Sequence, residues 1–468
     1  MIYFSDTKEQ MRDKISRPAP RAPSLCSRPA TSFDRSSILR TIPKEKLNGI
    51  IILTGHQPTF HHPGILIKNV LAHNLARQSG GIAIHMVHDT DAEEIIFPYP
   101  ERVSDIVKKK SAKLNDASQI LRHESFKPAD RSAMLRLTDA LRSEVRLVFG
   151  PEMIGAIHGG LDLLEKSVRE ASRPMDVPDR LRLAWEAQNR IDVYTVYSSD
   201  LFESSSFQCF FEHVREHGDR FREIYNRLLA DYRRAKGIKN PAQPLPDLRP
   251  KELPFWVVQH GNRLPFIEGE TSDGQILPRA VTLTLFCRLF FCDVFVHGLG
   301  GERYDRITDE ILREFFDFAG APFTAASATL ALSSRADLRI FSRSTQEVER
   351  DLRAVEFDPT RFLAKTDRVR REKEDLIAEW HKNPASRSRL HREFVRLNEQ
   401  ARHGLNGVIE NLEWEKNLAR VANANRTFFG TRDLPYFFYD LSEIFQTVKD
   451  YVFFEKRSPS ASLAEARS

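Results

Sequence analysis

The stretch from Thr54 to Gly64 gathers side chains that can bind a ligand or move a proton. It reads TGHQPTFHHPG and is followed by Lys68, on what we predict to be the next helix. Histidine exchanges protons near neutral pH, glycine lets the backbone approach a ligand closely, and a helix start favours an anion. A turn whose histidines only cap the helix is the alternative. The substrate-binding and catalytic residues predicted here are Gly55, His56, Gln57, His62, Gly64 and Lys68.

A second polar stretch, His85 to Glu94, follows the next apolar run and reads HMVHDTDAEE. Because the carboxyl ends of neighbouring parallel strands meet at one edge of a sheet, we expect this stretch to lie beside His56. Carboxylates there can take protons, hold an amine or coordinate a cation. Neither stretch has the H-x-x-x-H or H-E-x-x-H spacing of a zinc site, so no metal is predicted. We predict His56, Asp89 and Asp91 as catalytic residues and His88 as a substrate-binding residue.

Two further segments place polar groups beside apolar runs. Pro278-Arg279 precedes an expected strand, and residues 297–304 read HGLGGERY after another. The glycines allow a ligand to approach closely, but the spacing is not G-x-G-x-x-G, so no dinucleotide fingerprint is predicted. A glycine-rich turn before an acidic helix start is the alternative for the second segment. The substrate-binding residues predicted here are Arg279, Gly300, Gly301, Glu302 and Tyr304.

The apolar runs predict the elements that must position these groups. Short runs rich in β-branched residues at 49–54 and 82–87 flank a helical pattern at 65–77, which makes one strand–helix–strand unit. Residues 116–186 and 207–236 read as charged helices. Further strands are expected at 255–258, 281–285 and 294–297. This alternation favours an α/β fold, a Rossmann-like parallel sheet core with helical insertions.

The last third of the chain has a different periodicity. Between 346 and 423 apolar residues recur at heptad spacing, interrupted at Asn383-Pro384, which predicts two long helices in a C-terminal antiparallel coiled-coil arm. A projecting arm would pair two copies of the chain, whereas an arm that folds back would bury its stripe on its own core. The aromatic stretch from residue 434 is expected to dock on the body. The predicted domains are a poorly ordered segment at 1–45, a core at 46–330, and the arm and tail at 331–468.

Composition and charge argue against several classes of protein. The 70 basic and 65 acidic residues leave a net charge of +5, too small a surplus to indicate a nucleic-acid partner. The most apolar stretch, 280–299, contains charged residues and is read as core rather than as a membrane span. The N-terminus lacks the apolar segment of a signal peptide. We expect the four scattered cysteines to be reduced, and the protein to be cytoplasmic.

The order of these motifs resembles that of the bacillithiol biosynthesis cysteine-adding enzyme family. That family has a strand ending in T-G-Q-Q, a glycine and a lysine on the next helix, a strand ending in E-D-H-D, a P-R pair, and a G-G-P-G-E-x-x-Y loop. The matching stretches here are Thr54–Gln57 with Gly64 and Lys68, His88–Asp91, Pro278-Arg279, and Gly300–Tyr304. The resemblance implies a Rossmann-like core, a helical insertion and a dimerising C-terminal coiled coil. The sequence departs from the pattern at His56, which replaces a glutamine, and at His88 and Thr90.

The resemblance implies ligase-type chemistry that joins cysteine to a glucosaminyl-malate sugar. The departures could change the substrate and keep the fold, so we predict a ligase-like enzyme that forms a C–N bond on a small anionic or amino-sugar substrate. The first loop also resembles the H-x-G-H nucleotidylyltransferases, with His62-Pro-Gly64 in place of their motif, which leaves a nucleotide cofactor and nucleotidyl transfer open. A non-catalytic ligand-binding or assembly protein is the other alternative. The expected partners are a small-molecule substrate and a second copy of the chain.

Overall fold

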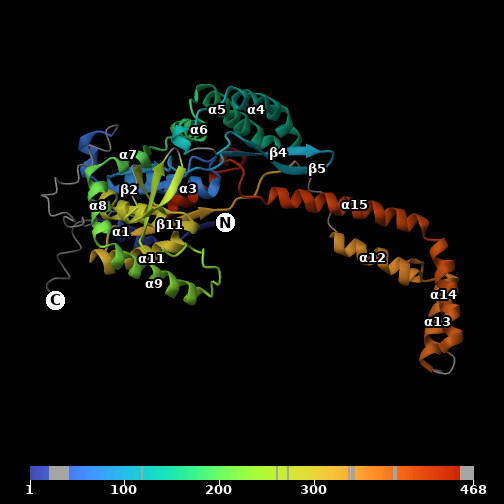
Figure 1. Ribbon diagram of the computed structural model, residues 1–468. Coiled ribbons are helices and arrows are strands. Elements are labelled where there is room, and N and C mark those ends of the chain that lie inside the picture. Colours follow the sequence, from blue (N-terminus) through green and yellow to red (C-terminus); the bar gives the residue numbers. More distant parts are fainter. Residues whose placement is uncertain are drawn as a thin grey trace, which may run out of the picture.

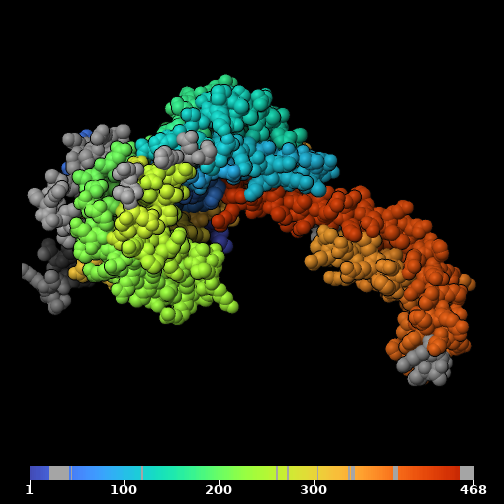
Figure 2. Space-filling model, in the orientation of Figure 1, coloured from blue at the N-terminus to red at the C-terminus, as the bar shows by residue number. Residues whose placement is uncertain are grey.

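The computed structural model describes residues 1–19, 42–117, 120–259, 262–270, 274–335, 338, 343–382 and 387–453. Figure 1 shows a body built around a central sheet, and a helical arm that projects from the body. In Figure 2 the arm is a slender extension that is joined to the body at one end. All the residues predicted to form the site belong to the body.

The central sheet has the strand order of a Rossmann fold. Its parallel strands run β11-β10-β2-β3-β6, which is 5-4-1-2-3 when they are numbered along the chain, and β1 pairs antiparallel with β11 at the edge. This order confirms the predicted Rossmann-like α/β core. The strands are β1 (Ile2–Phe4), β2 (Ile51–His56), β3 (Ile82–Val87), β6 (Tyr194–Tyr197), β10 (Val294–His297) and β11 (Phe323–Ala328).

Helices cover both faces of the sheet, because its central strands are apolar on both sides. In β2, Ile52 belongs to the core cluster that includes α3 and α16, while Ile51 and Leu53 belong to the cluster that includes α10 and α11. Burial on both faces is the reason that this strand reads as a continuous apolar run. The helices are α3 (Pro63–Ser79), α10 (Ala280–Phe286), α11 (Leu299–Phe316) and α16 (Ser442–Val452).

Two insertions interrupt the alternation of strands and helices. The first, between β3 and β6, is a hairpin followed by a helical layer, and the second, between β6 and β10, joins helices to an antiparallel sheet of order β8-β7-β9. The first contains β4 (Ile96–Val103), β5 (Ile106–Lys113), η2 (Leu121–His123), α4 (Pro128–Val148), α5 (Pro151–Glu170) and α6 (Asp176–Gln188). The second contains α7 (Ser198–Phe202), α8 (Ser205–Glu216), α9 (Gly218–Lys236), β7 (Glu252–Gln259), β8 (Asn262–Ile267) and β9 (Gln275–Pro278).

Several elements of the body differ from the prediction. Residues 281–285, predicted as a strand, belong to α10, which runs into the π-helical turn η3 (Cys287–Phe291). A short buried apolar run has the same pattern in a helix and in a strand, so periodicity could not separate the two. The hairpin β4–β5 was not predicted. Residues 1–19 were expected to be poorly ordered, but they contain β1 and α1 (Lys8–Lys14), and η1 (Lys44–Asn48) precedes β2.

The expectation for the cysteines was only partly correct. Cys287 and Cys292 are free and buried, but Cys209 is disulfide-bonded, so the prediction was wrong for this residue. Cys26 lies outside the described residues. Within the described part of the chain, no helix is both long and apolar enough to cross a bilayer.

In the described residues the arm has four helices where two were predicted. They are α12 (Thr345–Phe357), α13 (Arg368–Lys382), α14 (Arg387–His403) and α15 (Asn406–Phe429). Helix α12 packs on α15, and α13 packs on α14 (Figure 1). The turn η5 (Pro359–Phe362) separates α12 from α13, which the sequence predicted as one helix, whereas the predicted break at 383–384 lies outside the described residues. The apolar stripe is buried between the arm's own helices through Val348, Val355, Leu405 and Leu412.

The chain returns from the arm into the body through residues 432–439, which we call the return segment. It contains the turn η7 (Tyr436–Phe438), whose aromatic side chains are buried in the core. The N–H of Tyr436 donates to the carbonyl of His61 at 2.9 Å, and its hydroxyl donates to the carbonyl of Leu181 at 3.2 Å. These contacts confirm that the aromatic stretch docks on the body, between the first insertion and the predicted ligand loop.

Candidate functional site

A pocket of about 680 Å³ opens at the carboxyl ends of β2 and β10. These strands are neighbours at the place where the strand order reverses, which is where open α/β sheets bind ligands. Gly55 and His56 line the pocket at the end of β2, and His297 and Gly298 line it at the end of β10. The volume is in the range of small-molecule sites. This pocket is the candidate functional site.

Most of the predicted site residues line this pocket. Those in its wall are Gly55, His56, Gln57, His62, Gly64, Lys68, His88, Asp91, Arg279, Gly300, Gly301 and Tyr304. They come from the ends of β2 and β3, from α3 and the loop before it, from the start of α11, and from the residue before α10. The topology therefore brings together segments that lie up to 249 residues apart in the chain.

Asp89 and Glu302 do not line the pocket. Asp89 is 2% exposed, and its carboxylate accepts hydrogen bonds from Ser198 Oγ and the N–H of Ser199, both at 3.0 Å, and from the Ser199 hydroxyl. It thus holds the start of α7, a structural role rather than the predicted catalytic one. Glu302 accepts from the hydroxyl of Tyr3, which lies 3.2 Å from each carboxylate oxygen. It therefore ties α11 to β1.

Lys68 is a buried cation with no carboxylate at ion-pair distance among the described residues. It is 3% exposed, and its Nζ donates to the carbonyl of Gly55 at 2.7 Å. Burial lowers the pKa of Lys68 to about 7, so its amine titrates close to neutral pH. A buried charge without a counter-ion is costly, and an anionic ligand would remove that cost. Lys68 is therefore placed to bind an anion.

The start of α3 has no amide left for a ligand. Nδ1 of His62 accepts from the N–H of Gly64 at 3.0 Å, and the carbonyl of His62 accepts from Ile65 at 2.9 Å and from Leu66 at 3.1 Å. The helix was expected to bind an anion here, but the protein's own groups occupy the amides. The alternative, in which a histidine caps the helix, describes His62 correctly.

The start of α11 has free amides. The helix follows Gly298 without a side-chain cap, and the N–H groups of Leu299, Gly300 and Gly301 have no acceptor among the described residues. A Cβ atom on Gly301 would lie 2.5 Å from Nδ1 of His297, so only glycine fits at this position. A Cβ atom on Gly298 would lie 4.0 Å from Cδ of Lys68, which places that side chain beside the helix start. Together, the α11 amides and Lys68 form an anion-binding arrangement.

Two histidines near Lys68 are held in the neutral form. Burial, with a further effect of the Lys68 charge, lowers the pKa of His56 to about 3, and burial lowers the pKa of His88 to about 4. Nδ1 of His56 lies 3.2 Å from the carbonyl of Gln57 and 3.3 Å from the hydroxyl of Thr59. A neutral imidazole can accept a proton, and a bound anion nearby would raise its pKa.

A wall of aromatic and guanidinium groups faces the pocket from the second insertion. The guanidinium carbon of Arg279 lies 4.2 Å from the centroid of the Trp256 ring, and that of Arg263 lies 5.5 Å from it. Arg279 donates to Glu252 at 2.5 Å, and Arg263 forms an ion pair with Asp91. Trp256 and Arg263 were missed at the sequence level, because nothing in the local pattern shows where β7 and β8 dock. We call Trp256, Arg263 and Arg279 the Trp256 wall.

Asp91 was predicted to be catalytic and does line the pocket, where its charge is balanced. Besides the ion pair with Arg263, its Oδ2 accepts from Nε2 of Gln57 at 3.3 Å. The carboxylate therefore joins the first ligand loop to the Trp256 wall.

Two further pocket residues, His297 and Arg432, were not among the predicted site residues. Nε2 of His297 lies 2.7 Å from Oδ2 of the fully buried Asp305, which also lies 3.4 Å from Arg288. His297 opens the motif HGLGGERY, so the motif contained a signal for it. Arg432 belongs to the return segment and lines the pocket from there. No local pattern distinguishes it from the other arginines of the chain.

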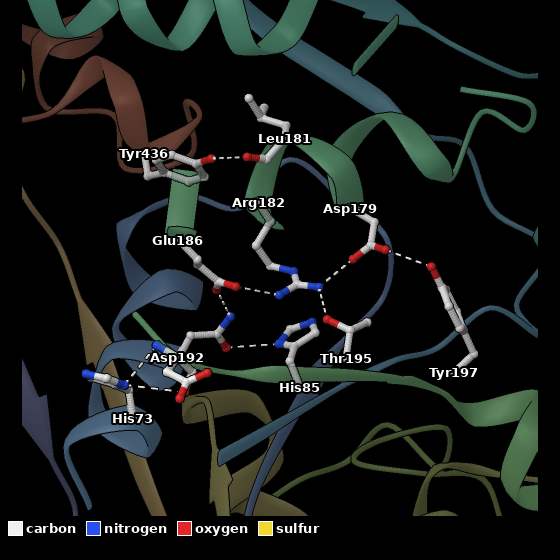
Figure 3. A network of polar contacts seen from close by, with 11 residues as sticks. His73, His85, Asp179, Leu181, Arg182, Glu186, Asp192, Thr195, Tyr197 and Tyr436 are labelled. Atoms are coloured by element: carbon white, nitrogen blue, oxygen red, sulfur yellow. Dashed lines mark hydrogen bonds and ion pairs between the residues drawn. The ribbon is translucent and has the colours of Figure 1, made fainter. Parts of the chain in front are cut away.

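A buried network of polar side chains, centred on Arg182, lies between α6, α3 and β6 (Figure 3). Arg182 is 2% exposed and donates to Asp179, and to Glu186 and Thr195 at 2.7 Å each. The hydroxyl of Tyr197 donates to the other oxygen of Asp179 at 2.8 Å. The guanidinium is therefore paired on both sides. We call Arg182 and these partners the Arg182 network.

The network extends to the ligand loop through α3 and β3. Asn69 donates to Glu186, and its Oδ1 lies 2.9 Å from Nδ1 of His85. The ring of His61 then lies between His85 and His56, with centroid distances of 5.3 Å and 5.8 Å. The network thus supports the loop that carries His56 without lining the pocket itself.

Among the described residues, no group of histidine, cysteine, aspartate and glutamate side chains is arranged to hold a metal ion. The groups available to an organic ligand are the amides of α11, Lys68, the neutral histidines and the Trp256 wall.

Comparison with known proteins identifies no family. No family model matches the chain, and no curated protein matches its sequence. Among solved structures, the crystal structure of tyrosyl-tRNA synthetase from Aeropyrum pernix matches at 10% identity with a TM-score of 0.24, over 90% of this chain and 99% of that one. So low a score carries no argument about this chain. The resemblance to the cysteine-adding family stays a prediction.

Proposed function

We propose that this chain is a ligase-like enzyme that binds a small anionic substrate in the pocket between β2 and β10. The observation that carries the proposal is Lys68, a buried cation to which no described residue offers a carboxylate, beside the free amides at the start of α11. Binding groups that lack a partner inside the protein are the ones a ligand can satisfy.

The charges around the pocket support an anionic ligand. Lys68, Arg263, Arg279 and Arg432 line it. Arg263 is paired with Asp91 and Arg279 with Glu252, so the surplus of positive charge comes from Lys68 and Arg432. A pocket with a positive surplus attracts anions and raises their local concentration. An amino-sugar acid, a carboxylate or a phosphate ester meets this requirement.

The chemistry we propose is formation of a C–N bond. An attacking amine forms the new bond and gives its proton to the neutral imidazole of His56, while the group that it displaces leaves with the bonding electrons as an anion. Lys68 and the α11 amides stabilise that anion as its charge develops. His88 and Asp91 orient the substrate, and Asp89 acts only on the fold.

Binding of inorganic pyrophosphate and of citrate to the full chain tests the anion site by calorimetry. We expect Lys68→Met to weaken both at least tenfold, because it removes the cation and keeps the volume. The matched control is Lys166→Met, at an exposed position on α5, which should bind like the parent. Absence of binding of either anion to the parent, or equal binding by Lys68→Met, would falsify the anion site.

The catalytic part needs a separate assay. The full chain is incubated with pairs of amino acids, amino sugars and organic acids, with and without ATP, and condensation products are measured by mass spectrometry. We expect a product from the parent and none from His56→Ala, with anion binding retained. If no pair reacts although anions bind, the chain is a binding protein rather than an enzyme.

The arm is proposed to pair two copies of the chain. Phe357 is 72% exposed at the end of α12, and Val395 is also exposed on α14, so the arm keeps apolar surface after burying its own stripe. Sedimentation of the full chain at micromolar concentration should give a dimer, and Phe357→Glu should shift it towards monomer. A monomeric parent would contradict the pairing.

A further inference from the structure

The pocket wall formed by residues 198–284 differs from the wall formed by the strand ends. It contains apolar side chains from several elements of the second insertion: Phe202, Tyr232, Ile238, Pro244 and Leu283. A carboxylate or phosphate alone would not use this surface. Sites that combine an apolar wall with a few polar groups bind ligands that have an apolar body as well as a charged end.

Ion pairs hold the two arginines of the Trp256 wall beside the indole. Glu252 pairs with Arg279 and Asp91 pairs with Arg263, and the two guanidinium carbons lie 4.2 Å and 5.5 Å from the centroid of the indole ring. Aromatic rings and arginine planes are the surfaces on which nucleobases stack in proteins. A surface that is already ordered loses little entropy when it binds a flat ring.

The topology places these features around a nucleotide-type crevice. The order β11-β10-β2-β3-β6 reverses between β10 and β2, and in Rossmann folds the phosphate lies at a helix start beside this crevice. Here the available helix start is that of α11, with Lys68 next to it, and the Trp256 wall lines the same pocket.

From these observations we propose that the pocket binds a nucleoside phosphate, with its base against the Trp256 wall and its phosphates at the α11 amides and Lys68. This inference rests on the proposed anionic site and names the class of ligand that fills the rest of the pocket. The apolar wall is the feature that separates a nucleotide from a simple anion.

The test compares ATP, AMP, adenosine and inorganic pyrophosphate on the full chain by calorimetry. ATP should bind at least tenfold more tightly than pyrophosphate, because only ATP has a base. Trp256→Ala should remove this preference and keep pyrophosphate binding, while Lys68→Met should weaken both. Trp414→Ala, at an exposed tryptophan on α15, is the matched control and should bind like the parent.

A second variant keeps the proposal testable if Trp256→Ala does not fold. Arg279→Lys keeps the positive charge but loses the plane that rests on the indole, so it should lower the preference for ATP at least threefold and leave pyrophosphate binding unchanged. Equal affinities for ATP and pyrophosphate, unchanged in both variants, would overturn the proposal that the pocket binds a nucleotide. The proposed anion site would still stand. If pyrophosphate and citrate also fail to bind, the proposed function fails as well.

Discussion

The Arg182 network and the pocket are both polar and buried, but the cation of the network is paired with carboxylates and the cation of the pocket is not. In the network, Arg182 lies between two carboxylates, and its remaining contacts are filled by Thr195. In the pocket, the described residues give Lys68 the carbonyl of Gly55 as an acceptor and no carboxylate. The comparison shows that burial alone does not identify a functional charge. A functional charge is identified by burial together with the lack of a counter-ion.

The difference has a physical origin. A buried ion pair stays charged because its partners compensate for the lost hydration, whereas a lone buried amine lowers its pKa instead. Lys68 follows the second route, since burial is the cause of its low pKa. The network therefore contributes to the stability of the fold, and the pocket keeps a binding capacity at the expense of stability.

Removing the centre of the network should have the largest effect. Arg182→Met leaves Asp179 and Glu186 buried and unpaired, so we expect the free energy of unfolding to fall by about 3–5 kcal/mol, measured by urea denaturation. The control is Arg180→Met on the same helix, where the pair with Glu170 is about half exposed and the change should stay within about 0.5 kcal/mol. An equal fall in the free energy of unfolding of the two variants would contradict the stabilising role of the network.

Removing the unpaired amine of Lys68 should raise the free energy of unfolding rather than lower it. Lys68→Met is expected to raise the free energy of unfolding by about 2–4 kcal/mol at pH 6, because the folded parent must keep a charge that the unfolded chain hydrates freely. The gain should shrink as pH rises from about 7, the pKa in the folded protein, towards 10.5, the ordinary value. A loss of stability at pH 6 would contradict the account of Lys68 as an unpaired charge.

The pH dependence of anion binding tests whether the unpaired charge of Lys68 controls the affinity of the pocket. Only protonated Lys68 attracts an anion, so sulfate should bind most tightly below pH 7 and weaken by up to about tenfold per pH unit above it. His56 and His88 are neutral throughout this range because their pKa values are about 3 and about 4. Lys68→Arg stays charged, and its sulfate affinity should be flat from pH 7 to 9, as thermal shift titrations can check. A flat profile in the parent would assign the effect to another group.

The parts of the site that lie on strand ends were predictable from the sequence. His56, His88 and Gly300 follow apolar runs, and parallel strands bring their carboxyl ends to one edge whatever the rest of the chain does. The fold class followed from the same runs. These features depend on local pattern and on one rule of topology.

The remaining parts depend on contacts over long distances in the chain. The role of Asp89 is decided by Ser198 and Ser199, more than 100 residues later, and Trp256 reaches the pocket only because the second insertion folds over it. The residue types at the start of α3 predict an anion site, but its amides are bonded to His62. Hydrogen-bond saturation of this kind cannot be read from residue types.

The position of the return segment has a consequence for folding during translation on the ribosome. The rings of Trp185 and Tyr436 pack at a tilt with their centroids 4.6 Å apart, and Phe437 packs on Gly160. These partners emerge long before residue 432, because the whole arm is translated in between. At about 5–20 residues per second, the roughly 250 residues between Trp185 and the return segment take about 12–50 s. During that time the nascent body exposes an aromatic surface, and the wait lengthens with every slow codon in the arm.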